Sequence, residues 1–290
     1  MSKSDAFDPL ACTPMLRADP STPSGPPIVT TSGLTRRFGE LIAVNDLSIS
    51  VSEGEVFGLL GPNGAGKSTT IKMLITLLPP SAGRAEVCGF DIARQPANVR
   101  RNIGYVPQMI STDGSLTGFE NLLIFAKLYD LPRREVRERV NASLEFMGLA
   151  DVAGHLVRTY SGGMIRRLEI AQSLLHRPRV LFLDEPTVGL DPAARRAVWE
   201  HVQRLREDYG TTIFLTTHVM EEADALCGRV AIMHRGVIAA LGAPRELKAG
   251  IGRPEASLDD VFIYYAGDSL SSGGTYRETR RIRRTSRRLG

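Results

Sequence analysis

The protein is a chain of 290 residues, long enough for one large domain or two smaller ones around a substantial hydrophobic core. Hydrophobic residues make up 42% and charged residues 23%, the net charge is +4, and neither a bilayer-spanning apolar run nor a secretory signal is present, so we expect a cytoplasmic protein. Its three cysteines, Cys12, Cys88 and Cys227, are odd in number and widely separated, which argues against a disulfide framework or a cysteine metal site.

The N-terminal part of the chain begins with a polar leader and continues with strand patterns. Six prolines among Ser, Thr, Asp and Gly predict that residues 1–27 are disordered. A helix is predicted over 67–78, where it stops before Pro79 and Pro80. Strand patterns, either β-branched or continuously apolar, cover residues 27–38, 41–51 and 55–60.

The C-terminal part alternates between strands and helices after a helical section over about residues 115–176. A Ser-x-x-Asp start followed by apolar residues predicts a short docked helix over 257–265. The alternation predicts an α/β fold with a mainly parallel sheet covered by helices. Predicted strands cover 102–108, 179–186, 211–218 and 229–242, and predicted helices cover 132–149, 192–210 and 219–228.

A glycine-rich loop at 61–68, "GPNGAGKS", fits the pattern Gly-x-x-x-x-Gly-Lys-[Ser/Thr] between a predicted strand and a predicted helix. Backbone N–H groups and the helix start can surround phosphates in such a loop. Lys67 can reach the outer phosphates, and the Ser68 hydroxyl can bind Mg²⁺. The loop therefore predicts a site for a nucleoside triphosphate with Mg²⁺.

Polar side chains follow two of the predicted strands. The apolar run "VLFLDEP" ends in Asp184, which is placed to hold the Mg²⁺ shell, and Glu185, which could polarise an attacking water. His218 ends the next strand, "TTIFLTTH", at the edge where ligands bind in open α/β sheets. A lone histidine is more often structural, but this position favours a ligand role.

A second phosphate-seeking helix start lies at 159–166, "TYSGGMIR". A serine and two glycines precede a helix in which Ile165, Leu168, Gln172 and Leu175 share one mostly apolar face. Small residues and free backbone N–H groups at a helix start can hold an anion. One chain thus carries two such helix starts.

The motifs together resemble those of the ATP-binding cassette (ABC) ATPases. "GPNGAGKST", "YVPQ", "YSGGM", "LFLDEP", "GLDP" and "TTH" occur in the order and rough spacing of that family, over about residues 28–265. The resemblance implies a P-loop NTPase core with an antiparallel β subdomain and a helical signature subdomain. The implied division is a leader 1–27, the core with the β subdomain 28–108, the signature subdomain 109–176, the continued core 177–243, a docked helix region 244–269 and a basic disordered tail 270–290.

The resemblance assigns roles to individual residues. Glu185 would be the general base, His218 the switch histidine on the γ-phosphate, and Gln108 a loop glutamine that touches the metal and moves with a membrane partner. Phe38 would stack on the adenine of ATP, with a plain core position as the alternative, and Asp191 would communicate across a dimer. The implied phosphate and metal residues are Gly61, Pro62, Asn63, Gly64, Ala65, Gly66, Lys67, Ser68 and Thr69, with Ser68, Gln108 and Asp184 at Mg²⁺.

The resemblance also explains the second helix start. In that family two cassettes meet head to tail, and the signature helix of each caps the γ-phosphate held by the other. Ser161, Gly162 and Gly163 would therefore act on the ATP of a second copy in a homodimer. The family signature is Leu-Ser-Gly-Gly-Gln, whereas Tyr160 and Met164 stand at its ends here. The polar centre is retained, and the effect on turnover is left open.

The stretch from "YSGGM" to "GLDP", with "SLDDVFIYYAG", is similar to daunorubicin-type resistance exporters, which pair a separate cassette with an ABC-2-type permease. This implies an ATPase subunit on the inner face of the membrane that powers export of a drug-like or antibiotic-like molecule. The alternative is a soluble ABC ATPase acting on ribosomes or nucleic acid, but those carry two cassettes or a long coiled-coil insertion.

Residues 277–290 hold seven arginines and one glutamate, a net charge of +6, so the rest of the chain carries −2 against the total of +4. This basic end could aid membrane contact through anionic lipids, could bind nucleic acid, or could be a solvated terminus. Nucleic acid is not the partner that we expect.

Overall fold

A computed structural model describes residues 25–253 and 255–270. Nearly all of the predicted leader and of the basic tail, and Cys12 with them, lie outside the described residues. Cys88 and Cys227 are buried free thiols. In the described part of the chain, none of the helices has the length and apolar character needed to cross a membrane.

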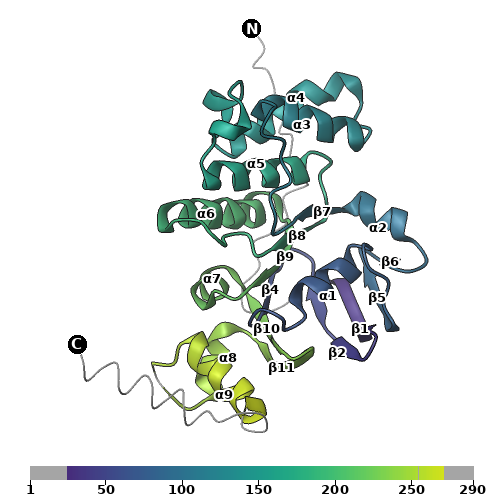
Figure 1. The fold of residues 1–290 in the computed structure, drawn as a ribbon, viewed down its shortest axis with the longest axis vertical. Coiled ribbons are helices and arrows are strands. Elements are labelled where there is room, and N and C mark those ends of the chain that lie inside the picture. The colour runs from purple at the N-terminus through teal and green to yellow at the C-terminus, as the bar shows by residue number, and fades with distance from the viewer. Residues whose placement is uncertain (1–24, 254, 271–290) are drawn as a thin grey trace.

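The central element is a six-stranded sheet with the order β11-β10-β4-β9-β8-β7 (Figure 1). Neighbouring strands from β10 to β7 run parallel, as expected for an α/β fold, and β11 pairs antiparallel with β10. The segment 229–242, predicted as strand throughout, is a hairpin that turns at Arg235 and Gly236, both of which have positive φ. The strands are β4 (Val56–Leu60), β7 (Ile103–Val106), β8 (Val180–Asp184), β9 (Thr212–Thr217), β10 (Arg229–His234) and β11 (Val237–Gly242).

A second, antiparallel sheet lies beside the first, with the order β2-β1-β5-β6 and β3 paired to β1. The helix α1 (Lys67–Leu74) contacts strands of both sheets, namely β2, β5 and β8, and so fills the space between them. The short helix α2 (Pro96–Asn102) leads into β7. The strands are β1 (Pro27–Phe38), β2 (Leu41–Leu47), β3 (Ser50–Ser52), β5 (Ala82–Val87) and β6 (Phe90–Asp91).

The predicted helix over 67–78 is too long at its C-terminal end. α1 ends at Leu74, and Thr76 has a φ of 66°, which no α-helix accommodates. The N–H groups of Leu77 and Leu78 instead donate to the Lys72 carbonyl at 2.9 and 3.0 Å, which closes the turn. The chain therefore leaves the helix before the prolines are reached.

Helices α3 to α5 come between β7 and β8 in the chain. They form one group, with α3 and α4 stacked beyond α5 (Figure 1). α3 begins with a capping box in which Thr117 accepts from the Glu120 N–H and the Glu120 carboxylate accepts from the Thr117 N–H. α8 and α9 lie at the opposite end of the molecule. The helices are α3 (Gly118–Leu128), α4 (Arg133–Phe146), α5 (Gly162–Leu174), α6 (Pro192–Tyr209), α7 (Met220–Leu226), α8 (Pro244–Gly250) and α9 (Leu258–Leu270), with 3₁₀ turns Ala150–Val152 and Val157–Thr159.

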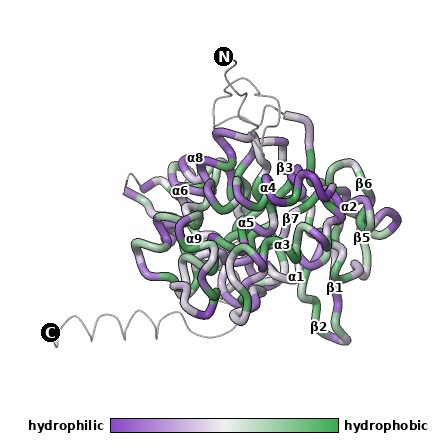
Figure 2. Tube along the Cα trace, turned by 90° about the horizontal axis from the view of Figure 1, so that it is seen from above, coloured by the Kyte–Doolittle hydropathy of each residue, from purple (hydrophilic) through white to green (hydrophobic). Residues whose placement is uncertain are grey.

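The two faces of the parallel sheet bury two different hydrophobic cores. Alternate residues such as Leu183 and Leu215 face the core formed with α3 to α9, whereas Phe57, Phe182 and Phe214 face α1 and the antiparallel sheet. Phe214 lies between the other two rings, with centroids 5.3 and 5.4 Å away. In Figure 2, hydrophilic segments lie at the edges of the molecule near α2 and α6. Because both faces are packed, the C-terminal ends of the strands are held at fixed positions.

Candidate active site

The loop between β4 and α1 packs so closely that two of its glycines leave no space for a side chain. A Cβ at Gly61 would lie 2.2 Å from the Met233 carbonyl oxygen, and one at Gly66 would lie 2.4 Å from the Ala43 carbonyl oxygen. Gly66 also has a φ of 109°, which favours glycine. No side chain caps α1, so its first N–H groups remain available to an anion.

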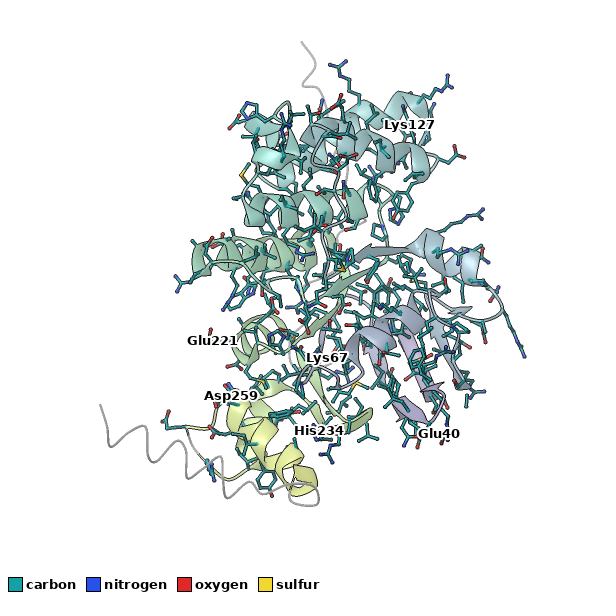
Figure 3. The ribbon with its side chains drawn as sticks, viewed as in Figure 1. Glu40, Lys67, Lys127, Glu221, His234 and Asp259 are labelled. Atoms are coloured by element: carbon teal, nitrogen blue, oxygen red, sulfur yellow. The ribbon has the colours of Figure 1, made fainter. Side chains whose placement is uncertain are left out.

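Lys67 lies beneath this loop, near the centre of the molecule (Figure 3), with only 4% of its surface exposed. Its Nζ donates to the carbonyl oxygens of Gly61 at 2.8 Å and Pro62 at 3.1 Å. The same Nζ forms an ion pair with Glu185 Oε1 at 3.1 Å. The charge of a buried lysine is thus paired and fully bonded at the base of the loop.

Asp184 connects α1 to the ends of two neighbouring strands. Its Oδ1 accepts from the Ser68 hydroxyl at 3.0 Å and from the Thr216 hydroxyl at 2.6 Å. Burial, with the Asp184 charge nearby, raises the pKa of Tyr105 to about 12. A single carboxylate beside a hydroxyl matches the few protein oxygens that Mg²⁺ accepts alongside phosphate ligands. These residues therefore fit a magnesium ion held together with a nucleotide.

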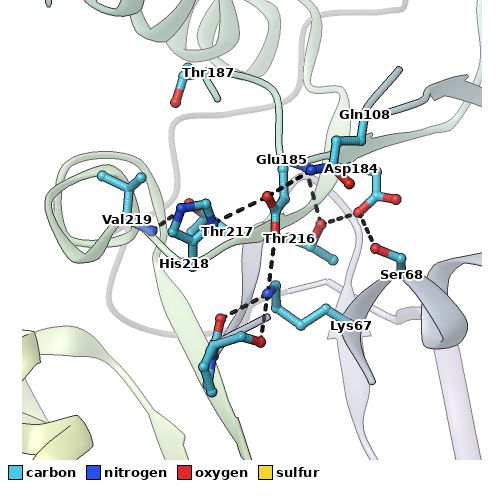
Figure 4. A network of polar contacts seen from close by, with 12 residues as sticks. Lys67, Ser68, Gln108, Asp184, Glu185, Thr187, Thr216, Thr217, His218 and Val219 are labelled. Atoms are coloured by element: carbon cyan, nitrogen blue, oxygen red, sulfur yellow. Dashed lines mark hydrogen bonds and ion pairs between the residues drawn. The ribbon is translucent and has the colours of Figure 1, made fainter. Parts of the chain in front are cut away.

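Glu185 is the point at which the polar contacts converge (Figure 4). Its Oε1 pairs with Lys67, and its Oε2 accepts from Gln108 Nε2 at 3.2 Å and contacts His218 Nδ1 at 3.1 Å. Its φ of 50° is unusual for a residue other than glycine, and its N–H donates to the backbone carbonyl of Thr216 at 3.0 Å. Three side chains from separate segments thus fix the carboxylate of a residue that is 3% exposed.

The second helix start lies at a different place on the surface. Ser161 is the N-cap of α5, and its hydroxyl accepts from the Met164 N–H at 3.3 Å. Ser161 and Gly162 are exposed, whereas Gly163 is buried so close to Ala194 that a Cβ there would lie 2.7 Å from the alanine Cβ. Among the described residues, no hydrogen bond or ion pair joins this helix start to the loop 61–68.

The comparisons with known proteins agree with this geometry. Residues 44–188 match the family model described as ABC transporter. The chain is 47% identical over 224 residues, 77% of its length and 68% of the relative, to the daunorubicin/doxorubicin resistance ATP-binding protein DrrA of Streptomyces peucetius. It is 46% identical over 253 residues, 86% of its length and 77% of the relative, to the Nod factor export ATP-binding protein I of Ralstonia nicotianae.

The chain belongs to the ABC transporter ATP-binding family. It is similar to a solved ATP-binding subunit of an ABC transporter, with a TM-score of 0.73 and 30% identity over 82% of this chain and 99% of that one. It is also similar to a dimeric ATP-binding cassette in a post-hydrolysis state with ADP and Pi, with a TM-score of 0.66 and 26% identity over 74% of this chain and 98% of that one. The protein binds and hydrolyses ATP and works with a membrane permease.

In this ABC ATPase the predicted site residues fall into two groups. Lys67, Ser68, Gln108, Asp184, Glu185 and His218 come together at the ends of β4, β7, β8 and β9. Ser161 to Gly163 lie apart from them, together with Asp191, which caps α6 by accepting from the N–H groups of Ala193 and Ala194 at 3.0 and 2.9 Å. The remaining predicted loop residues are Pro62, Asn63, Gly64, Ala65 and Thr69, with Asn63 and Gly64 exposed.

Phe38 lies at the end of β1 and is 45% exposed, so the alternative of a plain core position is wrong. The Arg36 guanidinium lies over its ring at 4.6 Å from the centroid. The paired strand β2 carries Ala43, whose carbonyl oxygen adjoins Gly66. The hairpin that carries Phe38 therefore borders the phosphate loop.

Sequence reasoning missed three polar features of this ABC ATPase. The first is the hydrogen bond from the Thr216 hydroxyl to Asp184. The only feature of the sequence that could have indicated it is a hydroxyl residue near the end of a buried strand. Glu222 accepts from Thr187 at 2.8 Å and from Trp199 at 3.1 Å, which ties α7 to α6 and to the segment after Glu185. A buried Arg166–Glu169 pair in α5 is the third, and its signal was opposite charges one helical turn apart.

Proposed function

We propose that this ABC ATPase powers export of a drug-like or antibiotic-like small molecule through a separate ABC-2-type permease. Two copies would enclose two ATP molecules, each bound by the loop 61–68 of one copy and the α5 start of the other. The observation that carries this proposal is the contrast between the buried Lys67 of the loop 61–68 and an exposed glycine-rich helix start at Ser161 in the same chain.

Glu185 would act as the general base. As the water oxygen bonds to the γ-phosphorus and the bond to the ADP oxygen breaks, Glu185 would accept the water proton. Its contacts with Lys67, Gln108 and His218 hold the carboxylate in one orientation for this step. Lys67 would place its charge on the outer phosphates, and His218 would contact the γ-phosphate.

Ser68, Asp184 and Gln108 would hold Mg²⁺ with the nucleotide. The Ser68 hydroxyl and the Asp184 carboxylate are already 3.0 Å apart, and both offer the oxygen atoms that this ion prefers. The bound ion would neutralise phosphate charge during the reaction. Phe38 would stack on adenine, and Asp191, beside the α5 start, would lie at the contact between copies.

The permease would contact the segment next to Gln108. Met109 and Ile110 are 82% and 64% exposed, and such a pair of apolar side chains on a loop suits a protein contact. The proposed functional units are 28–108 with 177–243 as the core, 109–176 as the helical signature subdomain and 244–269 as the docked helix region. This arrangement would place the protein at the inner face of the membrane, and relatives named for drug resistance and for Nod factor export favour export over action on ribosomes or nucleic acid.

Mixing two inactive variants tests the two-chain site. Ser161→Arg would put a bulky cation at the α5 start and spoil the neighbour's site, whereas Lys67→Ala would spoil the chain's own site. A mixed dimer has one site with an intact loop and an intact helix start, so ATP hydrolysis should partly return. Glu145→Arg, which adds the same cation at an exposed position of α4, is the control and should stay active.

Activity would be followed as phosphate release, and heterodimers would be detected with differently tagged chains. If tagged heterodimers form in the presence of ATP and no activity returns, the helix start does not serve the neighbouring site. If Ser161→Arg is active by itself, that same conclusion follows.

A further inference from the structure

The helix α5 contains a buried ion pair that the roles proposed above do not use. Arg166 Nη1 lies 3.0 Å from Glu169 Oε2, and the two side chains are 6% and 1% exposed. Their neighbours Leu168 and Ile170 belong to the hydrophobic core. Replacing a buried ion pair by apolar residues is often neutral or stabilising, so stability alone does not account for these charges.

Both charged side chains direct their remaining hydrogen bonds at the segment 107–111. Arg166 donates to the Pro107 carbonyl at 2.7 Å and to the Gln108 carbonyl at 3.1 Å. Glu169 Oε1 accepts from the Ser111 N–H at 2.6 Å and from the Ser111 hydroxyl at 3.0 Å. The pair therefore holds this segment at both ends, while Met109 and Ile110 between them are exposed.

The same segment carries the Gln108 side chain into the active site. Arg166 fixes the Gln108 carbonyl, and the Gln108 amide donates to Glu185 Oε2 at 3.2 Å. Arg166 and Glu169 are the fifth and eighth residues of α5, the helix that Ser161 caps. The segment 107–111 therefore connects α5 to Glu185.

We propose that Arg166 and Glu169 are a positioning pair that fixes the segment 107–111 to α5, so that Gln108 is presented to Glu185 and a push on Met109 or Ile110 moves the α5 start. This inference deepens the proposed function, on which it rests for the roles of Gln108 and the α5 start. It makes the pair the mechanical link between the permease-facing segment and the hydrolysis site.

The matched test removes both charges at once. Arg166→Met with Glu169→Leu leaves no unpaired buried charge, so the fold should survive, but the four bonds to 107–111 are lost. The expected result is an unchanged KM for ATP and a kcat lower by about 10- to 100-fold, the effect of a misplaced active-site group. Gln108→Ala should lower kcat similarly, and adding it to the double variant should lower kcat little further.

The control pair is Glu135 with Arg139 on α4. It is also an Arg–Glu pair on one helix, at 2.6 Å, and Arg139 also donates to a backbone carbonyl, that of Leu175 at 3.1 Å. Glu135→Leu with Arg139→Met should leave kcat unchanged. A full kcat in the Arg166/Glu169 double variant, or a full additional loss from Gln108→Ala within it, would overturn the proposal.

Hydrogen exchange gives a readout that needs neither ATP nor a second chain. The Ser111 amide, which loses its acceptor on Glu169, should exchange faster in the double variant, and equal exchange would overturn the inference while leaving the two-chain site untouched. Arg166→Lys covers the case of a double variant that does not fold. Lysine keeps the charge beside Glu169 but cannot copy the guanidinium fork that reaches both carbonyls, so kcat should fall with KM retained. Full activity of this variant contradicts the proposal.

Discussion

Two helix starts in this chain offer backbone N–H groups to an anion, and they differ in what surrounds them. At α1, Lys67 is buried and bonded to Glu185 and to the loop above it. At α5, Ser161 and Gly162 are exposed, and the next residue, Gly163, packs on Ala194. The charged residues beside the α1 start, Lys67 and Glu185, thus belong to the same chain. The second start, Ser161 to Met164, contains no charged residue, which is what we expect of a site completed by another copy.

The largest effect should come from the carboxylate on the α1 side. Glu185→Gln keeps the side-chain shape but removes the base, so ATP hydrolysis should fall by about 10²–10⁴-fold while ATP still binds. The variant should then accumulate as an ATP-dependent dimer, measured by light scattering beside phosphate release. The control is Glu200→Gln, at an exposed position of α6. If the Glu185→Gln enzyme hydrolyses ATP at the ordinary rate, Glu185 is not the general base.

Lys67→Ala should abolish most ATP binding at the α1 start. Loss of one partner of a buried charge pair typically costs about 2–5 kcal/mol, so the affinity should drop by about 30-fold or more. Fluorescent-nucleotide titration measures it, with circular dichroism as a check on folding. Lys72→Ala, an exposed lysine on the same helix, is the matched control. Equal affinities of the two variants would show that α1 does not bind the phosphates.

Acid should destabilise the packing around His176, which lies just after α5. Burial lowers the pKa of His176 from 6.5 to about 4, with Arg139 adding to the effect; the ring stacks on Tyr129 at 3.7 Å, and Nε2 bonds the Ile103 carbonyl at 2.8 Å. The folded state therefore binds fewer protons than the unfolded state between pH 6.5 and 4. This part of the stability is complete above pH 6.5 and is lost as the pH falls toward 4.

The slope should be about 1.4 kcal/mol per pH unit for this one proton. Urea unfolding at several pH values measures it, and His176→Gln should flatten the profile, whereas His155→Gln, at an exposed position, should not. Identical profiles for all three proteins would rule out His176 as the group responsible.

The smallest effect separates capping from catalysis at α5. Ser161 and Thr117 both cap helices through their hydroxyls, so Ser161→Ala and Thr117→Ala should each lower the free energy of unfolding by about 1 kcal/mol. Only Ser161→Ala should also lower the rate of hydrolysis at saturating ATP. If both variants hydrolyse ATP equally, Ser161 is a helix cap and nothing more.

Most of the fold can be predicted from local sequence patterns, and the errors of that prediction have local causes. The parallel strands are continuous apolar runs because both of their faces are buried, and the α3 to α5 section keeps a helical apolar spacing. β5 was not predicted, because "AGRAEV" is mostly exposed and forms a strand through its pairing with β1 and β6. The helix predicted over 67–78 is too long because the mostly apolar residues 75–78 continue the helical pattern. In the structure these residues leave α1 and form a turn.

The candidate site was predictable where its residues sit in short motifs, as with Lys67, Glu185 and His218. It was not predictable where one residue acts on another far along the chain. Thr216 contacts Asp184 across 32 positions, and Arg166 contacts Pro107 across 59. No local pattern encodes such pairs, since the sheet order and the packing of α5 create them.

The strand order also has a consequence for synthesis on the ribosome. β4, which leads into the phosphate loop, pairs only with β9 and β10 among the described strands, and both follow it by more than 150 residues. At about 5–20 residues per second, its five buried residues wait roughly 10–30 s for their partners. The antiparallel strands β1, β2, β3 and β5 can pair much earlier, because they are complete by residue 87. The nascent chain must therefore keep an apolar strand from aggregating while its neighbours are still being translated, which makes this segment a natural substrate for chaperones.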